Sequence, residues 1–183
     1  MSAENLRLRL RDGCADLHDR LDGAVARMDV REVAGLRGFL AMNAAAFGAL
    51  ACGGAKGVHV GTATIAGLAE AATRDLVSLG AAPGRVAPVM ADPLAVDYVV
   101  LGSRMGTRVL RRRWQGARNS SVLQADRYFS QPDMAPEWRA LCDDLSARPG
   151  DDARARVVLA DARALFTLFL DAQASTEETL ANA

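Results

Sequence analysis

His18 is the side chain in this sequence whose type and setting are best suited to holding a metal ion. The chain has only two histidines, so imidazole chemistry has few places to occur. His18 lies beside Leu17 and Leu21 in a segment of helical periodicity, and a neutral imidazole on a partly apolar helix face can ligate a metal. The competing interpretation is a structural histidine at a helix surface, which residue statistics favour. His59 lies in a glycine-rich stretch, where we expect it to be solvated.

Gly102 and Gly106 form the second feature, two glycines on one face of an apolar helical run from Asp97 to Leu110. Glycine weakens a helix interior by about 1 kcal/mol relative to alanine, so something bulky is expected to approach the backbone there. On its own the pair favours close packing of another helix. The alternative is a flat ligand, because a histidine on one helix facing glycines on another is the arrangement of a haem held between two helices.

Composition and charge set the class of protein. A chain of 183 residues that is 50% hydrophobic but only 5% aromatic predicts one all-α domain over residues 1–183. Its 22 basic and 22 acidic residues cancel, so we expect neither nucleic acid nor an anionic membrane surface as a partner. The three cysteines form no C-x-x-C pair and indicate neither a disulfide framework nor zinc. No signal peptide or membrane-spanning stretch is recognised, and we expect a cytoplasmic protein.

Helical periodicity and helix punctuation predict a bundle of six to eight helices with no strand alternation. We expect a threonine cap at the start of the third segment, and Asp92 followed by Pro93 at the start of the glycine-bearing segment. The expected segments are Ala3–Met28, Val30–Leu50, Thr62–Leu79, Pro93–Trp114, Val122–Phe129, Glu137–Ala147 and Asp151–Ala174.

Two motifs carry a resemblance to a known family. The segment Leu10–Asp22, which contains His18, resembles the first helix of the haem oxygenase family, where a histidine followed by leucine or a similar residue and an acidic residue is the proximal iron ligand. Tyr98–Gly106, which reads YVVLGSRMG, resembles the family's distal helix. The likeness is closest to the bacterial branch found alongside bacteriophytochromes, whose pattern is roughly Y-V-L-E-G-S-x-L-G-G. A weaker likeness extends over Arg127–Phe129, Trp138 and Ala162–Leu170.

The resemblance implies an all-α, single-domain haem-oxygenase-like helical bundle. Such an enzyme opens haem to biliverdin, iron and carbon monoxide with molecular oxygen and electrons from a ferredoxin, a flavodoxin or a reductase, and haem is both its substrate and its cofactor. The biliverdin could supply a bacteriophytochrome. The implied iron ligand is His18, the implied haem contacts are Arg11, Tyr98, Gly102 and Gly106, and the implied catalytic surface is Gly102, Ser103, Gly106 and Thr107.

Charged residues suggest further contacts. Arg11, which we expect on the same helical face as His18, is the best candidate to pair with the haem propionates, followed by Arg127 and Arg163. The basic run Arg108–Arg113 is explained by the dipole at a helix C-terminus, although an acidic electron donor could also dock there.

Three positions depart from the family pattern and keep other functions open. Leu101 stands where the branch usually has glutamate, Thr107 where it has a second glycine, and Ser103 where animal-type enzymes carry aspartate. The Thr107 hydroxyl could donate to bound oxygen or water, or crowd the pocket. The alternatives are a catalytically degenerate relative acting as a haem carrier, sensor or protein-binding module, and an unrelated helical bundle whose glycines pack against another helix.

Overall fold

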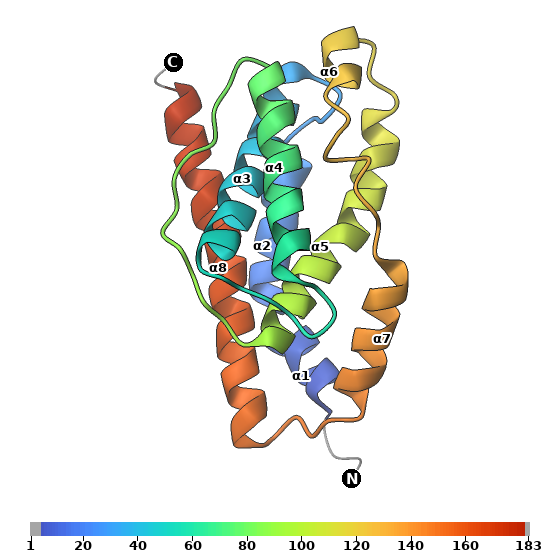
Figure 1. Ribbon diagram of the computed structural model, residues 1–183, viewed down its shortest axis with the longest axis vertical. Helices are drawn as coiled ribbons and strands as arrows, with labels where there is room; N and C mark the ends of the chain where they lie inside the picture. The colour runs from blue at the N-terminus through green and yellow to red at the C-terminus, as the bar shows by residue number, and fades with distance from the viewer. Residues whose placement is uncertain (1–4, 182–183) are drawn as a thin grey trace.

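The computed structural model describes residues 5–181, with side chains through residue 175, and these residues form one helical body without strands (Figure 1). The all-α class and a count of six to eight helices are therefore confirmed for the described residues. The helices are α1 (Leu6–Gly13), α2 (Ala15–Ala26), α3 (Val33–Cys52), α4 (Thr62–Ser78), α5 (Pro93–Trp114), α6 (Ser120–Gln124), α7 (Ala135–Ser146) and α8 (Ala153–Ala181).

α3 is the central helix and packs against α4 and α8. It is apolar on nearly every side and mostly buried, as expected of a core helix. By length and composition, α3 is also the one described helix that could cross a membrane. The expectation that no stretch of the chain is apolar enough to do so was therefore wrong. In this structure, however, the neighbouring helices cover most of it.

The first helical segment is two helices rather than one. The helix is interrupted at Cys14, whose φ is −110°, and α2 begins at the next residue. Arg163 on α8 donates to the Gly13 carbonyl and, at 2.6 Å, to the Asp16 carboxylate, so that partners on α8 stabilise the break. The predicted start at Ala3 lies outside the described residues.

α5 begins as the sequence predicts, with Asp92 as N-cap and Pro93 at the first helical position. One turn later the buried Asp97 carboxylate accepts backbone N–H groups of residues 58–60 at 2.7 to 3.0 Å, which holds the loop before α4 against α5. Burial nevertheless raises the pKa of Asp97.

The loop before α4 also half-buries His59, so the prediction that His59 is solvated was wrong. The helix that follows has Gly61 as its N-cap, not the predicted Thr62.

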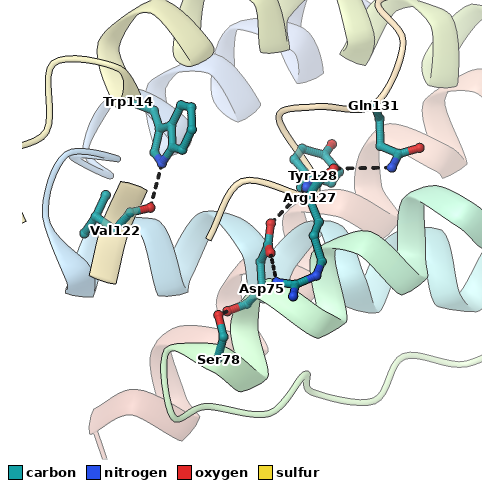
Figure 2. Close-up of polar contacts among 7 residues, drawn as sticks. All are labelled: Asp75, Ser78, Trp114, Val122, Arg127, Tyr128 and Gln131. Carbon is teal, nitrogen blue, oxygen red and sulfur yellow. Dashed lines mark hydrogen bonds and ion pairs between the residues drawn. The ribbon is translucent and has the colours of Figure 1, made fainter. Parts of the chain in front are cut away.

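The segment between α5 and α7 is anchored by polar contacts (Figure 2). Asp75 on α4, which is fully buried, accepts the Tyr128 backbone N–H at 2.9 Å and lies 3.2 Å from the Arg127 guanidinium. Trp114 at the end of α5 donates to the Val122 carbonyl at 2.8 Å. The helix predicted over 122–129 is present only in part, because α6 spans Ser120–Gln124 and the next residues form turns around the Asp75 carboxylate.

Replacing Asp75 tests how strongly this anchor stabilises the fold. Asp75→Ala leaves the buried Tyr128 N–H without its acceptor and should lower the free energy of unfolding by about 3 kcal/mol, measured by urea denaturation. Glu70→Ala on the same helix removes an exposed partner of Arg74 and should cost no more than about 0.5 kcal/mol. Equal losses for the two variants would contradict the assignment.

Candidate functional site

A cavity of about 600 Å³ lies between α2, α3, α5 and α8, with Trp138 of α7 in its wall. This volume is in the range of cofactor and ligand pockets. Its lining is mostly apolar: α2 contributes Leu21 and Val25, α3 contributes Phe39 and Met42, and α8 contributes Phe166 and Phe169.

His18 lines the cavity from the α2 side. Its side chain is 57% exposed, its ring packs edge-on against Phe166 at 5.8 Å, and its Nδ1 lies 3.3 Å from the Asp22 carboxylate one turn further along α2. A carboxylate beside Nδ1 favours the proton on that nitrogen, which leaves the Nε2 lone pair available to a metal. Across the described residues, no group of three or more His, Cys, Asp or Glu side chains is arranged to hold a metal ion. A single imidazole suffices for iron carried in a porphyrin, whose ring nitrogens supply further ligands.

Gly102 and Gly106 line the same cavity from α5. A Cβ placed on Gly106 would meet no described atom outside its immediate surroundings within 4 Å, and one placed on Gly102 would meet only Trp138, at 3.7 Å. No other helix therefore packs tightly on the pair, contrary to what the helix-packing interpretation predicts. The missing side chains widen the cavity instead.

The polar residues on the α5 side use their hydroxyl donors within their own helix. Ser103 donates to the Val100 carbonyl at 2.7 Å, and Thr107 donates to the Ser103 carbonyl at 2.9 Å. Both residues line the cavity, as does Asn43 of α3. Leu101 is fully buried in the core and is not among the lining residues, so its departure from the family pattern concerns packing.

The arginines predicted to meet a charged ligand lie elsewhere. Arg11 pairs with Asp12 and lines a second cavity of about 360 Å³ between α1 and α7. His18 lines the main cavity and Arg11 the second one, so the two residues do not meet at one site as predicted. Arg127 pairs with Asp75 and Arg163 with Asp16. Arg113 is the arginine that lines the main cavity.

Tyr98 and Trp138 stand between the two cavities and line both. Burial raises the pKa of Tyr98 to about 12, so its hydroxyl stays protonated at neutral pH. The structure thus brings His18, Tyr98, Gly102, Ser103, Gly106 and Thr107 to one cavity, and it places Arg11 on the far side of the Tyr98–Trp138 partition.

Sequence reasoning missed several residues of the site. Asp22 was recognisable as the i+4 neighbour of His18, a spacing that places side chains together on a helix. Asn43 is the one amide in the apolar run Phe39–Leu50, and a lone polar residue in a buried helix is a signal for a specific hydrogen bond. Arg104 and Tyr128 lie in segments that carry the resemblance, but nothing in the sequence indicated their contact, because the partners that hold them come from distant segments.

Comparisons with protein-family models, curated proteins and solved structures return no match.

Substituting the glycines separates an open cavity from a packed interface. Gly106→Ala adds a methyl group into open space and improves helix propensity, so it should raise the free energy of unfolding by about 0.5–1 kcal/mol. Gly35→Ala on α3 is the control, because its Cβ would lie 2.3 Å from the Asp29 carbonyl oxygen, and it should destabilise the fold. Destabilisation by Gly106→Ala in thermal or urea unfolding would support the packing interpretation.

The tyrosines provide a pH prediction. The chain has two, and burial raises the pKa of both. The unfolded chain ionises its tyrosines near pH 10 and the folded chain does not, so the folded state binds more protons and its stability falls as pH rises from about 10 to 12. Tyrosinate absorbance should appear together with loss of helical circular dichroism. A tyrosine that ionises near pH 10 in the folded protein would contradict this.

Proposed function

We propose that this protein is a haem oxygenase of haem-oxygenase-like fold that opens haem to biliverdin, iron and carbon monoxide. The observation that carries the proposal is the cavity with an imidazole on the α2 side and bare helix backbone at Gly102 and Gly106 on the α5 side. The resemblance of the His18 and Tyr98–Gly106 segments to the family's proximal and distal helices supports it independently.

The residues present fit a haem. His18 offers a ring nitrogen for iron, with Asp22 beside the other nitrogen. The space above Gly102 and Gly106 would accept the edge of a flat macrocycle, and a Cβ at either position would occupy that space. Phe166, Phe169 and Phe39 supply apolar contacts for a porphyrin.

When bound, haem supplies the oxygen and redox chemistry, which needs electrons from an external donor. The protein's own residues would hold the haem and shield it from water. His18 would fix the position of the ring in the cavity, while Gly102 and Gly106 would let α5 approach it and restrict which edge is open. The apolar lining would keep bulk water from the reacting region.

Charged groups of the ligand would meet arginines at the ends of the cavity. Arg113 lines one part of it, and Arg11 stands beyond Tyr98 at the partition with the second cavity. A propionate could reach Arg11 only past Tyr98 and Trp138. We therefore propose Arg113, in addition to Arg11, as a candidate partner of the propionates.

The electron donor we propose is an acidic ferredoxin, flavodoxin or reductase domain. Arg111, Arg112 and Arg113 form an exposed cationic turn at the end of α5. Because Arg113 lines the cavity, a donor docked on this turn would stand next to the haem site. The biliverdin formed would suit a bacteriophytochrome as its consumer.

One observation favours a second candidate, a haem carrier or sensor without turnover. Ser103 and Thr107 both donate their hydroxyl hydrogens to carbonyls of α5. Neither hydroxyl hydrogen is then free to donate to a ligand above the haem, and proton delivery would have to come from another wall of the cavity.

Hemin titration tests the proposal. We expect the purified protein to give the Soret band of a histidine-ligated haem, and His18→Ala to weaken hemin binding by at least about tenfold, since loss of an iron–nitrogen bond exceeds 1.4 kcal/mol. His59→Ala, which changes the other histidine, should leave the spectrum unchanged. The absence of hemin binding would contradict both haem functions.

Turnover then separates enzyme from carrier. With ascorbate or a reductase system, the long-wavelength absorption of biliverdin should grow as the Soret band declines. A stable Soret band under these conditions would support the carrier function.

A further inference from the structure

Arg104 is a cation buried behind the cavity, and no carboxylate among the described residues pairs with it. Its side chain is 2% exposed, and its Nε and one terminal nitrogen donate to the carbonyls of Pro132 and Gln131 at 3.2 and 3.0 Å. The other terminal nitrogen, Nη1, is buried with no hydrogen-bond partner among the described residues. A guanidinium remains protonated at any accessible pH, so the charge is permanent and little screened.

Tyr128 links this charge to the cavity wall. The guanidinium lies 5.0 Å from the centre of the Tyr128 ring, and the buried Tyr128 hydroxyl donates to Asn43 Oδ1 at 2.8 Å. A nearby cation polarises the O–H group and strengthens this bond.

The hydrogen bond from Tyr128 also fixes which end of the Asn43 amide serves as donor. With Oδ1 occupied by Tyr128, Nδ2 donates to the Phe39 carbonyl at 2.8 Å, and its second N–H remains. Asn43 lines the cavity, and no described carboxylate on α3 or α5 lines it with Asn43. The one lining carboxylate, Asp22, stands on α2 beside His18. This wall therefore combines an N–H donor with a permanent positive charge.

We propose that Asn43, which lines the cavity and is backed by the buried Tyr128 and Arg104, makes the cavity selective for a small anion or an anionic oxygen, with Arg104 acting as a positioning residue through Tyr128. The inference rests on the proposed function, because anion binding is measured on the protein with hemin bound. It gives the cavity a donor on α3 that the hydroxyls of α5 do not provide.

Fluoride and imidazole titrations of the hemin-loaded protein test the inference. Fluoride is an anion that depends on nearby hydrogen-bond donors, whereas imidazole is a neutral ligand. Tyr128→Phe keeps the ring beneath the guanidinium but removes the hydroxyl, and it should lower fluoride affinity by about tenfold while imidazole affinity changes less than about twofold. Arg104→Met should have the same selective effect, and Arg104→Lys should restore part of the fluoride affinity.

The control is Arg108→Met, which removes an exposed charge one turn along the same helix and should leave both affinities unchanged because solvent screens that charge. If Arg104→Met does not fold, Tyr128→Phe decides. Unchanged fluoride affinity in Tyr128→Phe, or equal losses for fluoride and imidazole, overturns the inference while the proposed function stands. Failure of the unmodified protein to bind hemin overturns both.

Discussion

The contacts of the buried Asp75 carboxylate position the residues behind Asn43, on the α3 side of the cavity. Burying a carboxylate is costly unless charged or N–H groups surround it, and here the Tyr128 backbone N–H and Arg127 do so. This contact fixes the turns after α6, and those turns present the carbonyls of Gln131 and Pro132 to Arg104. The anchor on α4 therefore helps to position both Tyr128 and Arg104 behind the cavity.

The cavity itself is costly to the fold. An open cavity between helices leaves its apolar lining without full burial and packing partners, and the glycines of α5 add a loss of helix propensity. A chain that tolerates both at one place can regain the free energy by binding a ligand that fills the space, because binding to the folded state alone stabilises it. The walls of the cavity differ in chemistry. The α2 side has the Lewis-basic nitrogen of His18, the α5 side has bare backbone, and aromatic rings line the edge, so a matching ligand would be flat, largely apolar and able to accept a nitrogen lone pair.

Helix caps and helical spacing predicted those features that depend on neighbouring residues in the chain. The start of α5 follows from Asp92 and Pro93. Helical spacing placed Gly102 and Gly106 on one face, and in the structure this face lines the same cavity as His18. The break at Cys14 depends on Arg163, which lies on the last helix, so periodicity could not reveal it. The polar wall depends on contacts between residues separated by up to 85 positions, and sequence reasoning had no means to pair them.

The three departures from the family pattern have different structural meanings. Leu101 belongs to the core and leaves the cavity surface unaltered. Ser103 and Thr107 lie on that surface, but their hydroxyl hydrogens are committed to carbonyls of α5. Donors for a ligand above the glycines would then have to come from α3, where the Asn43 amide has a remaining N–H. Under the proposed function, a ligand above the glycines would then depend on Asn43 and, as we propose, on the buried charge of Arg104 that lies against Tyr128.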